Sequence, residues 1–279
     1  MTIELFHSVS HECSRIVTNR YSTSFSSAIK LLHRDLRKPI FNIYGFVRFA
    51  DEIVDTFHSH DKDALLAQFK DETFIAIEKG ISLNPILNSF QQTVNQYRVD
   101  HDLIHAFFDS MESDLSKHQY DRQGYEEYIY GSAEVVGLMC LYVFCEGDKA
   151  LYQKLKQPAQ ALGAAFQKVN FLRDIKSDFH DLSRVYFPGC DFHNFTEKDK
   201  NQIERDIEED FKKAYDGIVK LPMKARFGVY VAYKYYYSLF RKIKTTKPHH
   251  ILQKRIRVPN HHKLCIIFRA SVKNGLGLI

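Results

Sequence analysis

The sequence predicts an all-α fold in a single domain that covers residues 1–279. Three observations lead to this prediction. Apolar residues recur with the 3.6-residue period of helices along most of the chain. Gly (12) and Pro (7) are scarce, which argues against an all-β chain rich in turns. Finally, no Gly/Ser linker, low-complexity stretch or repeat of 20–50 residues divides the sequence.

Periodicity and proline positions place the elements in order. Pro39, Pro85 and Pro222 stand where helices would begin, because a missing N–H costs nothing there. Pro158 is expected to separate a short helix from the long one that follows it. The segment Arg255–Val258 carries the best strand signal, although it is short. Helices are expected at 12–35, 40–58, 62–79, 86–97, 101–118, 123–146, 159–180, 198–219, 223–245 and 262–275.

The cysteines and the start of the chain indicate a cytoplasmic protein. The five cysteines are never spaced as CxxC and are interpreted as reduced, packed thiols. Met1–Leu5 contains an acid and no basic residue, so we expect no secretory signal. No run of 18 apolar residues exists, so we expect no membrane-spanning helix.

Charge is distributed unevenly along a chain whose net charge is +5. Residues 217–279 contain 14 Lys or Arg and no Asp or Glu. One interpretation is a solvated basic helical end. Another is a surface that meets phosphates, either of anionic lipid or of a substrate. We expect no nucleic-acid partner, because no helix-turn-helix, zinc-finger or RNA-binding signature accompanies the charge.

The segment Phe41–Phe57 carries the first informative pattern. Its apolar residues Phe46, Phe49, Ala50, Ile53, Val54 and Phe57 form a core-facing stripe. A second stripe on another face contains Tyr44, Arg48, Asp51 and Asp55. Asp51 and Asp55 stand one helical turn apart, about 6 Å along the axis. Half-buried carboxylates need a counter-charge, which a divalent cation would supply.

A similar stripe recurs within Leu162–Phe179. Gln167, Asn170, Asp174 and Asp178 fall at i, i+3, i+7 and i+11, and the neighbouring Lys168 points off this stripe. Carboxylate and amide oxygens suit Mg²⁺ or Mn²⁺ and not zinc.

Each acidic pair alone is typical of an ordinary solvated helix face. Two such stripes with Arg or Asn in phase instead favour a metal site. Facing each other across a bundle, they would hold Mg²⁺ ions and, through them, a diphosphate. Arg48 and Arg173 would then bind phosphate oxygens.

With these motifs, the sequence resembles the squalene/phytoene synthase family over about residues 12–270. The resemblance rests on YSTSF at 21–25, YGFVRFADEIVD at 44–55, YIYGSAEVVG at 128–137, QKVNFLRDIKSD at 167–178 and RVYFP at 184–188. Tyr236, Arg255, Arg257 and Lys263 fall where that family places a tyrosine and basic residues. The resemblance implies an isoprenoid synthase-type helical bundle with a central cavity.

The resemblance also implies roles for individual residues. Metal binding would fall to Asp51, Asp55, Asn170, Asp174 and Asp178, and substrate binding to Ser22, Ser24, Phe25, Tyr44, Arg48, Gln167, Arg173, Tyr236 and Arg255. Catalysis would depend on the four aspartates together with Tyr128. The rings of Tyr44, Tyr128 and Tyr236 would stabilise carbocations, each by about 1–2 kcal/mol; ordinary core packing is the alternative for each.

The implied reaction is that of a phytoene synthase in carotenoid biosynthesis, a Mg²⁺-dependent prenyltransferase. It joins two geranylgeranyl diphosphates head to head through a cyclopropyl (prephytoene) diphosphate. A squalene or dehydrosqualene synthase that uses farnesyl diphosphate is the alternative. A hypothesis of another class is a catalytically silent helical binding or assembly homologue. No GxGxxG is present, and we expect no NADPH requirement. We also expect loose association with the anionic inner face of a membrane, because substrate and product are apolar.

Overall fold

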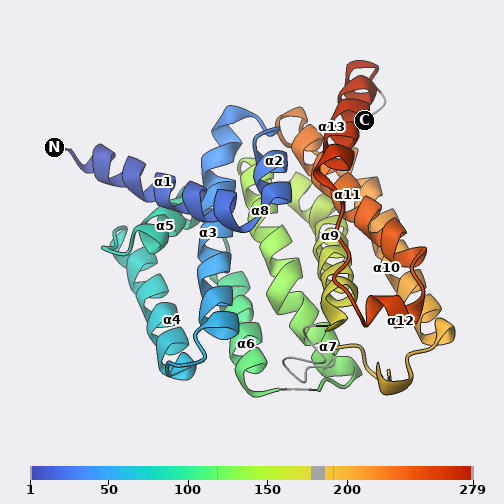
Figure 1. Ribbon diagram of the computed structural model, residues 1–279. Helices are drawn as coiled ribbons and strands as arrows, with labels where there is room; N and C mark the ends of the chain where they lie inside the picture. The colour runs from blue at the N-terminus through green and yellow to red at the C-terminus, as the bar shows by residue number, and fades with distance from the viewer. Residues whose placement is uncertain (1, 118, 177–185, 191, 278–279) are drawn as a thin grey trace.

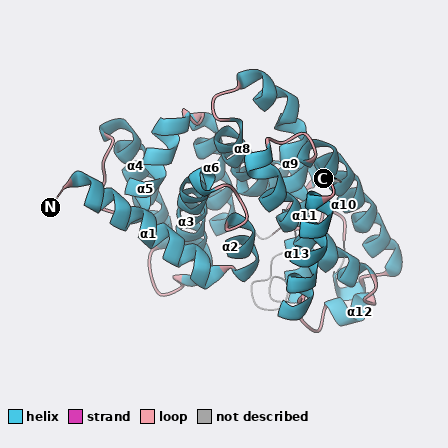
Figure 2. Cartoon of the chain, turned by 90° about the horizontal axis from the view of Figure 1, so that it is seen from above, coloured by secondary structure: helices cyan, strands magenta, loops and turns pink. Residues whose placement is uncertain are grey.

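The computed structural model describes residues 2–117, 119–176, 186–190 and 192–277, and all regular structure in these ranges is helical (Figures 1 and 2). The elements, in order, are α1 (Ile3–Tyr21), α2 (Thr23–Ile29), α3 (Arg34–Thr56), α4 (Lys62–Lys79), α5 (Pro85–Tyr97), α6 (His101–Ser116), α7 (Arg122–Ile129), η1 (Tyr130–Glu134), α8 (Val135–Cys145), α9 (Lys149–Lys176), η3 (Phe192–Asn194), α10 (Glu197–Ile218), α11 (Met223–Lys244), α12 (Pro248–Ile251) and α13 (Asn260–Gly275). The all-α prediction is therefore confirmed.

The first expected helix, 12–35, is two helices. The chain is helical from Ile3 but breaks at Ser22, which adopts an extended conformation between α1 and α2. The Ser22 hydroxyl accepts a hydrogen bond from the backbone N–H of Phe25 at 3.2 Å and so caps α2. Periodicity does not reveal this break, because the apolar pattern continues across it.

One of the three proline starts differs from the prediction. Pro85 is the first residue of α5, as expected, and Pro222 caps α11. Pro39, however, lies within α3, which starts five residues earlier at Arg34. Pro158 lies inside the continuous helix α9 instead of separating two helices. A Cβ added to Gly217 of α10 would lie 2.2 Å from the Cβ of Pro158, so glycine there allows the proline ring to pack closely against α10.

The predicted strand at Arg255–Val258 is wrong. This segment is an extended loop between α12 and α13, and the described part of the chain holds no strand with which it could pair. Lys242 anchors it by donating a hydrogen bond to the backbone carbonyl of Arg257 at 2.7 Å.

The expected helix 123–146 contains one π-helical turn, η1, where the N–H of Val135 bonds to the carbonyl of Tyr130. Gly131 lies here against α6, where an added Cβ would meet the carbonyl oxygen of Ala106 at 2.4 Å. Tyr128 and Phe144 are 16 positions apart, which in a regular α-helix turns their faces about 160° from each other. The extra residue of the π turn reduces this angle to about 60°. Both side chains therefore reach one cavity.

The core is continuous through the bundle. Phe46 of α3 stacks on Phe90 of α5 with ring centroids 3.8 Å apart. Phe49 and Phe57, expected on the same core-facing stripe, are instead 36% and 37% exposed. Phe49 lies at the edge of the stripe, and Phe57 follows Thr56, the last residue of α3.

Residues Arg122–Cys145 are long and apolar enough to cross a membrane by composition alone. In the fold, however, this segment is a central element. Val135, Leu138 and Met139 of α8 are fully buried in the protein core. We therefore interpret α8 as a core helix, whose apolar side chains face the protein core on one side and the cavity on another.

Two acids of α10 hold Lys168 of α9. The Lys168 ammonium lies 2.6 Å from Asp206 and 2.7 Å from Asp210, and its side chain is only 10% exposed. Lys168 thus points away from the acidic stripe of its own helix, as predicted. This buried ion pair helps to fix the rotation of α9 about its axis.

Candidate active site

A cavity of about 700 Å³ lies between the helices that carry the two acidic stripes. Its walls come from α2, α3, α8, α9 and α11, with contributions from α6 and α10. Asp51, Asp55 and Asp174 line one end. Leu32 and Phe144 line the other end, where the chain offers only apolar side chains. The cavity is therefore polar at one end and apolar along its length, as an isoprenoid diphosphate would require.

The first wall is the predicted stripe on α3, and Tyr44, Arg48, Asp51 and Asp55 all line the cavity. Burial and the neighbouring Asp55 raise the pKa of Asp51 to about 7. Arg48 pairs with Glu52 and lies 3.7 Å from Asp51, with its guanidinium 4.4 Å above the Tyr21 ring. Burial is the larger cause of the raised pKa, the Asp55 carboxylate adds to it, and Arg48 opposes it.

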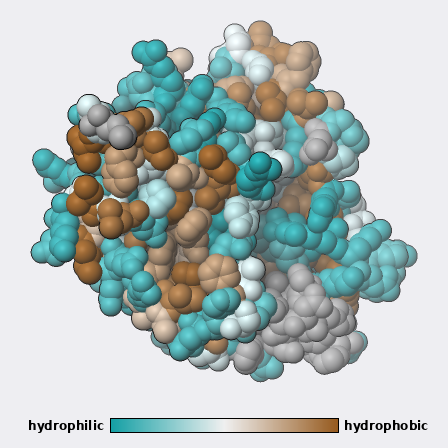
Figure 3. Space-filling view, turned by 60° about the vertical axis from the view of Figure 1, so that its left-hand side comes forward, coloured by the Kyte–Doolittle hydropathy of each residue, from teal (hydrophilic) through white to brown (hydrophobic). Residues whose placement is uncertain are grey.

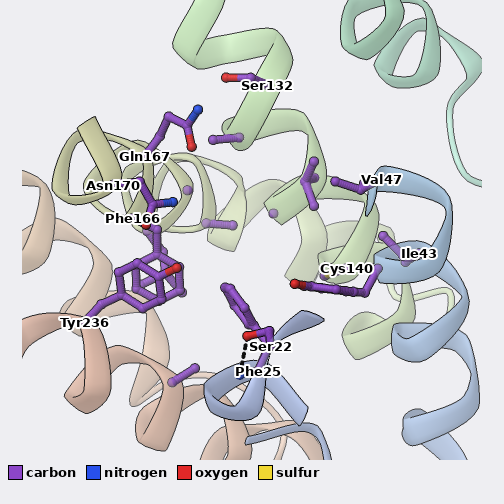
Figure 4. Close-up of a pocket in the computed structure, with 18 of the residues that line it drawn as sticks. Ser22, Phe25, Ile43, Val47, Ser132, Cys140, Phe166, Gln167, Asn170 and Tyr236 are labelled. Atoms are coloured by element: carbon purple, nitrogen blue, oxygen red, sulfur yellow. Dashed lines mark hydrogen bonds between the residues drawn. The ribbon is translucent and has the colours of Figure 1, made fainter. Parts of the chain in front are cut away.

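The second wall is the predicted stripe on α9. Gln167, Asn170 and Asp174 line the cavity from this helix, and Figure 4 shows the first two beside Phe166. The Asn170 side-chain oxygen is buried and accepts no hydrogen bond from the described residues. An unpaired buried amide oxygen costs free energy unless a ligand binds it. Asn170 is thus a polar group that a bound cation or donor would satisfy.

Two arginines meet the Asp174 carboxylate. Arg173 donates to it from the same helix, its Nη2 lying 2.5 Å from Oδ2. Arg255 approaches from the loop before α13, its Nε 2.7 Å from Oδ1. Both arginines also line the cavity, as predicted for phosphate-binding residues. In this structure both guanidinium groups contact the Asp174 carboxylate, which keeps the two arginine side chains at the polar end of the cavity.

Aromatic rings form the wall beside the polar end. Phe25 lies 5.6 Å from both Tyr44 and Tyr236, and Tyr236 stacks on Phe166 at 3.9 Å. Burial raises the pKa of Tyr44 to about 12, so its phenol is neutral at physiological pH. Ser22 also lines the cavity (Figure 4), whereas Ser24 is not among the lining residues. Ser24 follows the cap of α2 and faces another direction, because its neighbours Ser22 and Phe25 take the cavity side.

Sequence reasoning missed a buried carboxylate at Asp114. This α6 residue is 4% exposed, lines the cavity, and accepts hydrogen bonds from Tyr120 at 3.4 Å and Tyr186 at 3.2 Å. Tyr128 packs against both tyrosines, with ring centroids 5.1 and 5.2 Å away. A signal was available: Asp114 continues the apolar stripe of Phe107 and Met111 at helical spacing, where a carboxylate is out of place.

The arrangement suits a divalent cation that is completed by substrate oxygens. Asp51 and Asp55 offer carboxylates from α3, and Asn170 and Asp174 offer oxygens from α9. No group of three acidic, His or Cys side chains in the described part of the chain converges tightly enough to hold a metal alone. Mg²⁺ commonly takes one or two carboxylates together with substrate phosphates, which fits such an open site. The predicted ligand Asp178 lies outside the described residues.

Fold and site together define a helical isoprenoid synthase, and comparison with known proteins gives the family. A family model of squalene/phytoene synthases matches residues 18–262, so the chain belongs to the squalene/phytoene synthase family. Members of this family are prenyltransferases, and so is this protein.

The individual relatives include a phytoene synthase as well as a diapophytoene synthase and a dehydrosqualene synthase. A phytoene synthase of Arthrospira platensis is 26% identical, over 95% of this chain and 93% of its own. A 4,4'-diapophytoene synthase of Staphylococcus haemolyticus is also 26% identical, over 70% and 67%. A crystal structure of a dehydrosqualene synthase superposes with a TM-score of 0.82 at 17% identity, over 96% of this chain and 98% of that one. The shared fold is thus shown, whereas identity does not separate the two activities.

Proposed function

We propose that the protein is a phytoene synthase, which joins two geranylgeranyl diphosphates head to head through prephytoene diphosphate in carotenoid biosynthesis. The observation that carries this proposal is the length of the apolar cavity wall. On α9, lining residues run from Asn170 back to Leu155. These 15 positions correspond to about 22 Å along the helix axis.

That length can be compared with the two candidate substrates. An extended chain advances roughly 1.3 Å per bond, as the spacing of trans-linked atoms along a backbone illustrates. A farnesyl chain then reaches about 14 Å and a geranylgeranyl chain about 19 Å. The wall from Asn170 to Leu155 accommodates the longer chain with its diphosphate at the polar end. A cavity built for farnesyl alone would need less depth.

The polar end explains how the chain would bind a diphosphate. Arg48, Arg173 and Arg255 present guanidinium groups that can bind phosphate oxygens bidentately. Asp51, Asp55, Asn170 and Asp174 would hold Mg²⁺, or Mn²⁺, which supplies charge neutralisation for the departing diphosphate.

The aromatic wall explains how a reactive cation would be protected. The rings of Phe25, Tyr44, Phe166 and Tyr236 lie within about 6 Å of their neighbours and line the cavity next to its polar end. Their faces exclude water and stabilise positive charge by their quadrupoles. Tyr128 extends this wall toward Asp114. No NADPH is required, because phytoene forms by loss of a proton.

A C30 activity is the second candidate, favoured by the similarity to the diapophytoene and dehydrosqualene synthases. Purified protein should be incubated with Mg²⁺ and either farnesyl or geranylgeranyl diphosphate, with and without NADPH, followed by hydrocarbon analysis. A C40 product without NADPH supports the proposal. A C30 product as the only hydrocarbon contradicts it.

A variant at the apolar end tests the length argument separately. Leu155→Phe adds bulk at the far end of the wall, so turnover of geranylgeranyl diphosphate should fall more than turnover of farnesyl diphosphate. Leu155→Ile keeps the side-chain volume and is the matched control. If both substrates lost turnover equally in a folded Leu155→Phe protein, cavity depth would not determine the choice.

A further inference from the structure

The outer face of α13 is an apolar stripe that no described element covers. Leu264, Phe268, Val272 and Leu276 are 67%, 71%, 48% and 68% exposed. Figure 1 shows α13 rising above the rest of the bundle, and Figure 3 shows hydrophobic surface at the upper right, in this part of the molecule. Isolated exposed apolar residues are common, but three in a row on one helix, continued by its C-cap residue Leu276, are unusual.

The four residues share one face because of their spacing. Each follows the previous one after four positions, which turns the side chain by only about 40°, so all four lie within about 120° of arc. We call them the outer stripe. The opposite face holds the helix on the protein: Ala270 is 2% exposed, and Ile266 and Ile267 pack against the core. The helix is therefore anchored on one side and apolar on the other.

Positive charge borders the outer stripe. Arg269 and Lys273 are exposed beside it, and residues 217–279 contain no acid. Lys273 and Arg241 also lie near Lys234 of α11, whose pKa is lowered first by burial and then by these two charges. The basic flank is thus a repulsive cluster without acidic partners in this part of the chain. An apolar stripe bordered by positive charge is complementary to a layer whose interior is apolar and whose surface is negatively charged.

We infer that the outer stripe of α13 docks in the plane of an anionic lipid bilayer, with Arg269 and Lys273 at the level of the headgroups. An amphipathic helix of this kind buries its apolar face at the boundary between headgroups and acyl chains. A second copy of this chain fits less well, because it would bring one basic flank against another. Charge complementarity therefore selects the membrane as the occupant.

Contacts at the start of α13, on the side away from the outer stripe, place this helix next to the cavity. Lys263 donates a hydrogen bond to Thr23 of α2 at 2.9 Å. The adjacent residues Tyr21 and Ser22 line the cavity, and Tyr21 is 50% exposed, so the cavity reaches the surface at this junction. A docked α13 would bring that opening close to the bilayer. The docking surface itself does not depend on which isoprenoid the enzyme uses.

Vesicle co-sedimentation of the full chain tests the inference. The probes are phosphatidylcholine vesicles with and without phosphatidylserine, and no substrate is present. The wild type should bind the anionic vesicles at low salt and be released by high salt, because screening weakens the attraction. Leu264→Ser with Phe268→Ser should lower the partition coefficient about ten-fold or more. Leu83→Ser, at a 93% exposed residue before α5, is the matched control and should bind like the wild type.

Charge variants and a second readout complete the test. Arg269→Gln with Lys273→Gln should weaken binding roughly five-fold for each charge removed, and Lys79→Gln with Lys117→Gln on other surfaces should not. Turnover measured in detergent should be the same in the wild type and in all variants. A failure of the proposed activity would appear in this assay, whereas the vesicle assay tests the docking surface alone. The inference is overturned if the wild type ignores anionic vesicles or if the stripe variant binds unchanged. It is also overturned if sedimentation shows a dimer that the stripe variant dissociates.

Discussion

Replacing Lys168 by methionine should destabilise the fold strongly while leaving the cavity side chains unchanged. The substitution leaves Asp206 and Asp210 without their cation. Removing one partner of a buried ion pair typically costs about 3–5 kcal/mol. Asp206 is 37% exposed and can be hydrated, whereas Asp210 is 13% exposed. We therefore expect the free energy of unfolding to fall by about 2–4 kcal/mol.

Urea denaturation followed by circular dichroism measures this loss, and two variants serve as references. Lys212→Met, at an exposed position of α10, should stay within about 0.5 kcal/mol of the wild type. Lys168→Met combined with Asp210→Leu should recover much of the loss, since apolar replacement of a whole buried pair is often neutral. A Lys168→Met protein as stable as Lys212→Met would refute the argument that this pair fixes α9 on α10.

Three further predictions concern the acidic walls and the packing. Asp51→Ala with Asp174→Ala should lower turnover at least roughly 10³-fold without changing the circular dichroism spectrum. Chelation of divalent metal in the wild type should lower turnover in the same way. Retained turnover in either case would contradict the proposed site. Burial raises the pKa of Glu134, so its contribution to stability is present at low pH and lost as pH rises through the native pKa. Glu134→Gln should therefore raise the melting temperature at pH 8 and much less at pH 4.5, whereas an equal gain at both would show that this group does not titrate there. Gly217→Ala should cost about 1–3 kcal/mol in urea denaturation, because the new methyl would meet Pro158; an unchanged midpoint would mean that α10 shifts freely.

The acidic walls could be predicted because local geometry determines them. Spacings of three, four and seven residues place Asp51 and Asp55 on one helix face whatever the helix packs against. The same holds for Asn170 and Asp174 on α9. That the two faces line one cavity was implied by the resemblance, and the structure confirms it for the described residues.

Other parts of the site depend on contacts between distant segments. The approach of Arg255 to Asp174 joins residues 81 positions apart, and no periodic pattern encodes it. The break at Ser22 depends on a side-chain cap and not on hydrophobic spacing. Asp114 is visible in the sequence only as an acid in an apolar stripe, and its tyrosine partners come from other elements. These features depend on contacts between segments that are far apart in the sequence, so helical periodicity and spacing alone do not predict them.

The π-helical turn at Tyr130–Glu134 determines which changes of length this chain can tolerate. Deleting one residue there would let α7 and α8 join as an unbroken α-helix, with every backbone hydrogen bond made. Tyr128 and Phe144 would then be 15 positions apart in a regular α-helix, which keeps their faces about 60° from each other. Tyr128 would therefore still face the cavity. A single-residue deletion should therefore be accepted in this turn, whereas insertion of one further residue into the regular part of α8 would turn Tyr128 by about 100° relative to Phe144. The loop between α4 and α5, remote from the cavity, is where related chains could vary in length without loss of function.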